Sequence, residues 1–199
     1  MTTVDLVQRA SQLPAVLAHQ LRLAVLRAAH VLQQLSRRLA PDSAISKSDR
    51  PYALAIEDGL SALAVERHAV PLVRALIALA PQRWAAASIA IALQGRVALG
   101  DEIGAAFGAQ LVVVLIGERP GLSSPDSLGA YLTFAPRLGR TDAERNCVSN
   151  IRPEGLGIEA AARRIDWIAA AGVARGATGV GLKDESAALE ETRSISHAR

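Results

Sequence analysis

A short loop near the middle of the chain carries the residue types best suited to hold a ligand. The sequence Gly-Glu-Arg-Pro-Gly at 117–121 directly follows the apolar run Leu111–Ile116. That run is short and rich in β-branched residues, which favours a strand buried on both faces. Ligands of α/β sheets bind at the carboxyl ends of such strands. A carboxylate at Glu118, beside a cation and between glycines that admit a close approach, therefore predicts a polar ligand site here.

Other polar side chains stand at the ends of further predicted strands. The members of this predicted rim are Asp58, Ser61, Gln94, Arg96, Glu118, Arg119, Arg137 and residues 140–150. In a doubly wound sheet these ends meet at one edge, and the cluster would suit a large polar ligand with amides and a phosphate. Simpler roles stand beside this one. Glu118 and Arg119 could form a solvated pair, and Asp58 could cap the following helix.

The sequence lacks the spacings of familiar catalytic and metal-binding motifs. No GxSxG, GxGxxG or HExxH pattern occurs, and the single cysteine, Cys147, excludes an intrachain disulfide and a multi-cysteine zinc site. No histidine lies near Cys147 in sequence, so a small buried packing group is favoured over a nucleophile. We expect a ligand-binding domain without catalytic residues or metal ligands of its own.

Charge and hydropathy exclude two classes of partner. The formal net charge is only +3 and aromatic residues make up 3% of the chain, whereas nucleic-acid binders show dense basic patches with stacking aromatics. No apolar run reaches the roughly 18 residues of a membrane span. The lone cysteine fits a reducing compartment, so we expect a cytoplasmic protein that binds neither nucleic acid nor membrane.

Strands and helices alternate along the chain, which predicts an α/β fold. Strands are expected at 52–56, 88–93, 111–116, 131–135 and, as a last short one, 179–182; helices are expected at 62–79 with a kink at Pro71, at 101–107 and at 158–173. Thr141 and Glu144 have the spacing of a capping box, which predicts a turn through residues 145–150. The alternation predicts a mostly parallel sheet with helices on both faces, a Rossmann-like arrangement of three layers.

An N-terminal helical arm is expected to precede this domain. Between Leu21 and Leu39 apolar residues recur in steps of four and three, the spacing of a seam that packs along another helix. The arm would cover either its own domain or a partner subunit. Polar residues at 42–50 read as a linker. We therefore predict an arm and linker at 1–50, an α/β domain at 51–190 and a tail at 191–199.

Several long motifs resemble the small subunit, or light chain, of ethanolamine ammonia-lyase. The resemblance runs from about Ala53 to Ser186, roughly two-thirds of the chain. The motifs that carry it are DGLSALAVERHAVPL (58–72), QGRVALGDEIG (94–104), LVVVLIGERPGLSSPDSLGAYLTFAPR (111–137), GRTDAERNCVSNIRPEG (139–155) and GVGLKDES (179–186). The third and fourth are too long and uncommon for a chance match.

The resemblance implies an adenosylcobalamin-dependent lyase that converts ethanolamine to acetaldehyde and ammonia. In that family the large subunit carries the substrate site and the radical chemistry. The small subunit, inactive alone, helps to hold the cobalamin where the two chains meet. Matching motifs place its cobalamin contacts on Val97, Glu118 and Cys147. Val97 would supply apolar contact, Glu118 would accept hydrogen bonds, and Cys147 would pack; the complex would lie in the cytoplasm, free or within a bacterial microcompartment.

Two features depart from the family pattern. Residues 1–52 lack the Gly-Arg-rich segment and the Arg-Pro-Asp-like motif that usually precede the first strand. Glu57 stands at a position expected to hold a small residue. These departures keep an alternative open, in which the chain is a divergent or truncated corrinoid- or nucleotide-binding module without lyase activity.

Overall fold

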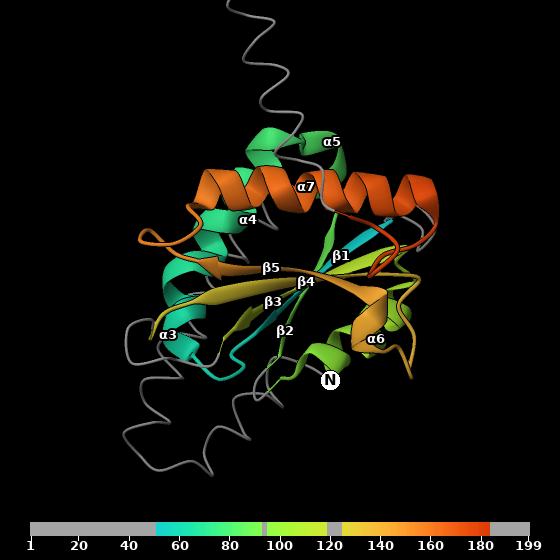
Figure 1. Cartoon of the computed structure of the whole chain (residues 1–199), viewed down its shortest axis with the longest axis horizontal. Helices are drawn as coiled ribbons and strands as arrows, with labels where there is room; N and C mark the ends of the chain where they lie inside the picture. Colours follow the sequence, from blue (N-terminus) through green and yellow to red (C-terminus); the bar gives the residue numbers. More distant parts are fainter. Residues whose placement is uncertain (1–50, 93–94, 119–124, 184–199) are drawn as a thin grey trace, which may run out of the picture.

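The structure is a computed structural model that describes residues 51–92, 95–118 and 125–183. A five-stranded sheet lies between two layers of helix (Figure 1). Its strands, in the spatial order β2-β1-β3-β4-β5, are β1 (Tyr52–Glu57), β2 (Ser88–Ala92), β3 (Leu111–Gly117), β4 (Leu128–Phe134) and β5 (Arg145–Ile151). The predicted arm at 1–50 and tail at 191–199 fall outside the described residues.

The sheet is mixed, so the α/β class is confirmed but a mostly parallel, Rossmann-like sheet is not. β1 pairs in parallel with β2 and with β3, whereas β4 runs antiparallel to both β3 and β5. The reason is the short connection from β3 to β4. A parallel crossover needs about a dozen residues or more, usually as a helix, and residues 118–127 are too few.

Two short segments near the C-terminal end differ from the sequence prediction. Residues 145–150 were expected in a turn, but they belong to β5 (Arg145–Ile151), an edge strand. The strand expected at 179–182 is a turn in the structure. There Gly179 has a φ of +91°, and the Asn146 side chain bonds the backbone of Gly179 and Leu182. The Asn146 amide therefore holds this turn against β5.

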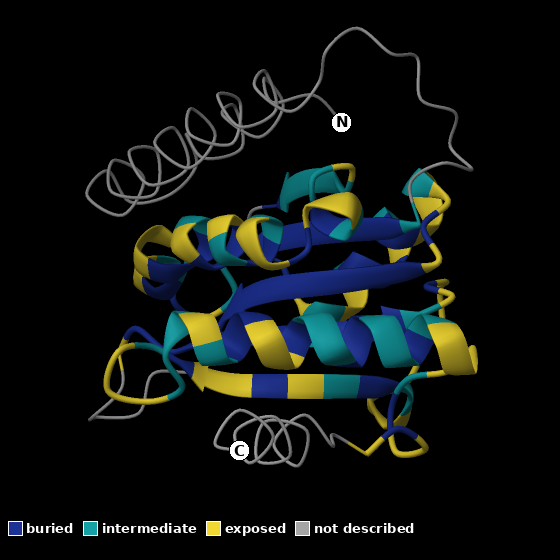
Figure 2. Cartoon of the chain, turned by 90° about the horizontal axis from the view of Figure 1, so that it is seen from above, coloured by how far each residue is buried: buried dark blue, intermediate teal, exposed yellow. Residues whose placement is uncertain are grey.

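Helices cover both faces of the sheet. α6 (Val97–Phe107) lies on one face, and α3 (Ala62–Ala64), the π-helical η3 (Val65–Ala69), α4 (Val70–Leu79), α5 (Pro81–Trp84) and α7 (Ile158–Arg175) lie on the other (Figure 1). A short 3-10 helix, η4 (Asp142–Glu144), precedes β5. In Figure 2 buried, intermediate and exposed residues alternate along α7, and its buried residues include Ala161, Ile165 and Ile168, as its amphipathic sequence predicts. None of the helices in the described ranges is long and apolar enough to cross a membrane.

The kink expected at Pro71 takes the form of a π-helical turn. Proline has no N–H for the helical bond, and its ring collides with the carbonyl four residues earlier, here that of Arg67. The wider π turn of η3 begins just before that carbonyl and relieves the collision. The helix therefore continues from α3 through η3 into α4.

The two faces of the sheet are packed differently. The face under α4 and α7 is lined by large buried residues such as Leu54, Leu115 and Ile165. The other face is lined by small ones, among them Ala55 and Val112. α6 approaches this second face closely, and a Cβ added to its Gly100 would lie 2.0 Å from Val114. α6 packs mainly on the middle strand β3 and its neighbour β1.

Candidate ligand-binding site

Glu118 is held at the end of β3 on the α6 face. Its N–H donates to the Ser127 carbonyl (2.9 Å), which extends the pairing of β3 with β4. Its Oε2 accepts hydrogen bonds from the Ser127 hydroxyl and from the Asn150 N–H (3.1 Å). The carboxylate lies over Gly129, where an added Cβ would come within 2.8 Å of Oε1. Glu118 is thus a half-buried carboxylate whose position is fixed from two strands.

Cys147 lies directly opposite Tyr131 in the antiparallel pair of β4 and β5. The two side chains are close enough for each to affect the pKa of the other. Cys147 is exposed along the edge strand, so the expectation of a buried residue is wrong; the buried residues of β5 are its neighbours on the other face. The protein atoms around its sulfur nevertheless raise the pKa of the thiol above its ordinary value, and the thiol stays protonated at neutral pH.

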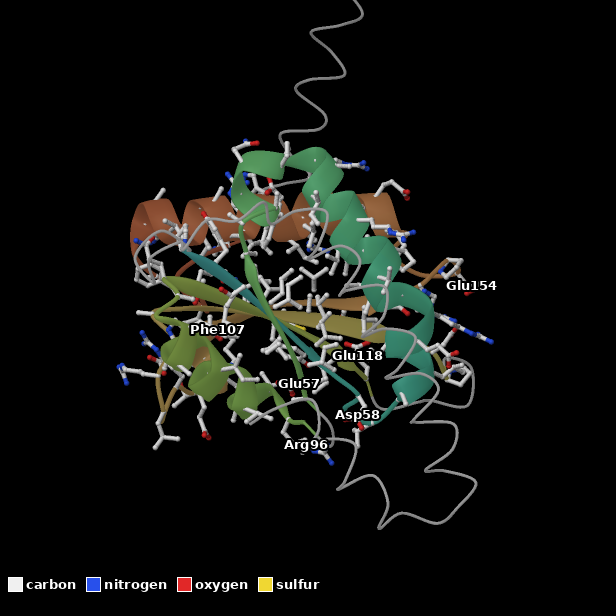
Figure 3. All side chains as sticks on the ribbon, turned by 180° about the vertical axis from the view of Figure 1, so that it is seen from behind. Glu57, Asp58, Arg96, Phe107, Glu118 and Glu154 are labelled. Carbon is white, nitrogen blue, oxygen red and sulfur yellow. The ribbon has the colours of Figure 1, made fainter. Side chains whose placement is uncertain are left out.

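Val97 is the first residue of α6, and it is held there by the end of β1. Asp58 Oδ1 accepts a hydrogen bond from the Gly95 N–H (3.2 Å), and the Arg96 guanidinium donates to the Gly95 carbonyl (2.7 Å). Half-buried Val97 packs against the apolar cluster on this face. Figure 3 shows Asp58, Arg96 and Glu118 at the same end of the sheet, away from Phe107 at the far end of α6.

The three residues expected to contact the cofactor therefore lie on one face of the sheet. Tyr131 joins them, although sequence reasoning did not select it. It packs on the same apolar cluster as Val97 and adjoins Cys147, and the Glu118 charge acts on it. The alternation along β4 could have indicated this face for Tyr131, but only the strand register shows which residue stands opposite.

The predicted rim does not form as one cluster. Since β4 runs antiparallel to β3, the residues that follow β4 lie near the start of β3, at the opposite end of the strands from Glu118. Arg137 and Arg140 are placed there, whereas Asn150, at the far end of β5, returns to Glu118. Gln94 and Arg119 fall outside the described residues.

Arg145 has a structural role at that opposite edge. Its buried guanidinium donates to Asp101 of α6 and to Asp142 (2.9 Å). Arg140 bonds the Ala135 carbonyl (2.9 Å) and the Glu144 carboxylate, which also closes the predicted capping box on Thr141. These arginines hold α6, η4 and β5 together.

Glu57 is a buried acid that the sequence did not predict. It belongs to β1, is 0% exposed, and has no hydrogen-bond partner at either carboxyl oxygen. Burial, reinforced by the nearby Asp58 and Asp101 charges and opposed by Arg96, raises its pKa to about 8. The side chain points at Gly95, where an added Cβ would lie 2.3 Å from Oε2. At neutral pH Glu57 is therefore mostly the neutral acid.

Acidic, histidine and cysteine side chains do not assemble into a metal site within the described part of the chain. Groups of three or more that could hold an ion do not occur there. The arrangement around Glu118 is instead a fixed carboxylate with a thiol, a phenol and an apolar residue on one face. Such a set can accept and donate hydrogen bonds and offer apolar contact to a ligand.

Comparisons with known proteins show which family the chain resembles. A model of the ethanolamine ammonia-lyase light chain family (EutC) matches residues 18–183. The small subunit of ethanolamine ammonia-lyase from Azotobacter vinelandii is 52% identical over 161 residues, 76% of this chain and 60% of that protein. Its counterpart from Bradyrhizobium diazoefficiens is 61% identical over 144 residues, 70% of this chain and 55% of that protein.

The matched region contains Val97, Glu118 and Cys147, together with Tyr131. A further small subunit, from Ralstonia nicotianae, is 56% identical over 66% of this chain and 49% of its own length. The chain thus spans about half to three-fifths of the curated relatives it matches. The family match covers most of the chain, including part of the predicted arm, and the chain belongs to the ethanolamine ammonia-lyase light chain family.

Proposed function

We propose that this chain is the small subunit of an adenosylcobalamin-dependent ethanolamine ammonia-lyase, which converts ethanolamine to acetaldehyde and ammonia. In this proposal the α6 face around Glu118 forms one wall of the cofactor site, and a large subunit completes it. The observation that carries the proposal is the fixed Glu118 carboxylate, which shares its face with Val97 and Cys147. We also place the complex in the cytoplasm, free or within a bacterial microcompartment, since a single cysteine is typical there.

The chemistry of these residues fits the cofactor. A corrin ring carries many amide side chains, and a carboxylate is a strong acceptor for their N–H groups. Glu118 Oε2 is already held by Ser127 and Asn150, so the carboxylate loses little freedom when a ligand binds. Val97 offers apolar surface at the start of α6, and the protonated Cys147 thiol is small and polarisable.

The cofactor, once bound, supplies the radical chemistry through its cobalt–carbon bond. This chain would bind and orient it. Glu118 would accept hydrogen bonds from amide or sugar groups and so fix the rotation of the ring, while Val97 and Cys147 would exclude water at its edge. No residue of this chain is assigned a catalytic role in the proposal.

The proposal is tested by co-expression of the chain with the large subunit of an ethanolamine ammonia-lyase. A stable complex should co-purify, retain added adenosylcobalamin and release ammonia from ethanolamine. A monodisperse chain that forms no complex with such a partner, or a complex that retains no cobalamin, would contradict the proposal. Cobalamin retention by the chain alone would point to the stand-alone corrinoid-binding module.

Glu118→Gln sharpens this test. Glutamine keeps the shape of the side chain and removes the charge. A charged acceptor strengthens a hydrogen bond by roughly 1 to 2 kcal/mol, so the variant loses this amount. We therefore expect the Kd for cobalamin in the complex to rise by roughly tenfold. Glu159→Gln is the matched control, because Glu159 is exposed on α7 at the opposite face. Equal affinity in the wild-type and Glu118→Gln complexes would remove Glu118 from the site.

A further inference from the structure

Tyr131 lies on the same face of the sheet as the proposed cofactor contacts. It belongs to β4, where Cys147 lies directly opposite on β5. Gly129, two positions earlier and on the same face, lies beneath the Glu118 carboxylate. Tyr131 is thus adjacent to two of the three residues expected to contact the cofactor.

The ring of Tyr131 also continues the apolar surface that Val97 begins. Both are half-buried, and both pack on the cluster that includes Val114 and Ile116. α6 covers mainly β1 and β3, so at β4 this face keeps part of the ring accessible. A ligand resting on Val97 and Glu118 would therefore meet Tyr131 between them and Cys147.

The hydroxyl of Tyr131 keeps its proton in this setting. Burial, the neighbouring Cys147 and the charge of Glu118 together raise the pKa of the phenol to about 12. At physiological pH the group is a neutral O–H donor. Its neighbour across the strand pair is the Cys147 thiol, whose sulfur is a weak hydrogen-bond acceptor. An amide carbonyl or a phosphate oxygen would be a stronger acceptor.

We propose that Tyr131 is a further cofactor-contacting residue, whose hydroxyl donates a hydrogen bond to an oxygen acceptor of the cobalamin while its ring extends the apolar wall from Val97. This inference rests on the proposed function, because it takes the same cofactor and the same face. It adds a donor to a site whose other expected contacts are an acceptor, a thiol and an apolar residue. Glu118 would then accept hydrogen bonds from amide N–H groups, and Tyr131 would donate one to a carbonyl or phosphate oxygen.

The test replaces Tyr131 by phenylalanine in the complex with the large subunit. Phe keeps the ring and its packing and removes only the hydroxyl. The control is Tyr52→Phe, the other of the two tyrosines in the chain, which lies on the opposite face against Trp84. The Kd for adenosylcobalamin and for cyanocobalamin is measured by equilibrium dialysis, and thermal melts compare the folds of the complexes.

We expect Tyr131→Phe to raise both Kd values by about five- to tenfold, the usual effect of one lost hydrogen bond, and Tyr52→Phe to leave them unchanged. If the wild-type complex binds cobalamin and Tyr131→Phe binds it within twofold as tightly, this inference is overturned and the proposed function stands. A wild-type complex without cobalamin overturns the proposed function itself.

A second pair of variants keeps the inference falsifiable if Tyr131→Phe does not fold. Tyr131→Gln retains a long side chain with hydrogen-bond donors, whereas Tyr131→Leu retains apolar bulk and has none. The inference requires the Gln variant to bind cyanocobalamin more tightly than the Leu variant. The reverse order would show that only the apolar bulk of the ring contributes, and would overturn the assigned hydrogen bond.

Discussion

The two faces of the sheet are formed by the same strands but differ in their side chains: one is an apolar core, and the other carries polar groups. On the α7 face, large apolar side chains from the strands, α4 and α7 form a continuous core. On the α6 face one helix covers small residues of β1 and β3, and polar side chains follow on β4 and β5. Within the described residues, the buried polar atoms that lack a hydrogen bond belong to Glu57, Asp101, Thr133 and Arg145 around the α6 face and to His68.

This difference indicates that one face mainly determines stability and the other mainly determines ligand binding. A fully packed face gains free energy from buried apolar area, and any change in volume there is felt in stability. A face that keeps buried acids and half-covered polar groups gives up part of that gain. Glu118, Tyr131 and Cys147 lie on this second face, so we expect changes there to alter cofactor binding more than folding.

Glu57→Gln should give the largest effect on stability. The unfolded carboxyl ionises near 4.5 and the folded one near 8, so the folded state binds the extra proton between these values. Stability therefore falls as pH rises from about 4.5 through about 8. The size of this pKa shift limits the stability lost on ionising Glu57 to about 5 kcal/mol at higher pH. We expect Gln to recover about 2 kcal/mol at pH 8.5, because its amide still lacks a partner.

Urea unfolding of the full chain at pH 5 and pH 8.5 measures this effect. Wild type and Glu57→Gln should be nearly equal at pH 5 and separate at pH 8.5. Glu102→Gln, an exposed position on α6, provides the control and should show no such separation. A constant difference between Glu57→Gln and wild type at both pH values would mean that the carboxyl does not titrate in this range.

Gly129→Ala should weaken cofactor binding by about tenfold. The new methyl group would come within 2.8 Å of Glu118 Oε1, and the carboxylate must move away from Ser127 and Asn150. Loss of a held, charged hydrogen-bonding group costs roughly 1.5 kcal/mol or more, which corresponds to that factor.

A glycine on the opposite face supplies the comparison. Gly172 of α7 packs against Thr178, with an added Cβ at 2.9 Å from its methyl group. Gly172→Ala should leave the Kd for cobalamin in the complex unchanged, whatever it does to the melting temperature. Equal losses of affinity in the two variants would show that the faces are not separate in function.

The strands of the parallel half were predictable because each is a short apolar run bounded by breakers. β3 was expected at 111–116 and ends one residue later. β5 was missed because its buried apolar residues, Val148 and Ile151, are three apart. A bulge in its pairing with β4 breaks the two-residue period that marks a strand. The antiparallel half was missed because β4 was expected to begin at Tyr131, and the interval from 117 to 130 is long enough for a parallel crossover, whereas β4 begins at Leu128.

The site was only partly visible in the sequence. The resemblance supplied Val97, Glu118 and Cys147, and the strand-end argument independently supplied Glu118. Tyr131 depends on a register with a strand that had not been predicted. The first strand was expected to end at residue 56, before Glu57, because an acid inside a buried strand contradicts the usual cost of burial. Long-range pairing and buried polar groups are the features that a local pattern does not encode.

Glu144→Gln should give the smallest change in stability, and its pH dependence should run opposite to that of Glu57→Gln. The Thr141 backbone N–H, the Arg140 guanidinium and the Thr141 hydroxyl lower the pKa of Glu144 to about 2. This group therefore adds stability above about pH 4.5 and loses it as pH falls through about 2. Melting temperatures of the variant should lie below wild type at pH 7 and approach it near pH 2.

Glutamine can still accept the Thr141 bonds, so the variant removes the charge and keeps the capping box. A difference that persists unchanged at pH 2 would assign the loss to altered cap geometry, not to charge. Glu57 is buried beneath α6, whereas Glu144 lies at the partly exposed edge of the sheet. Opposite pH dependences of stability at these two glutamates would show that burial, and not the residue type, sets the direction of the pKa shift.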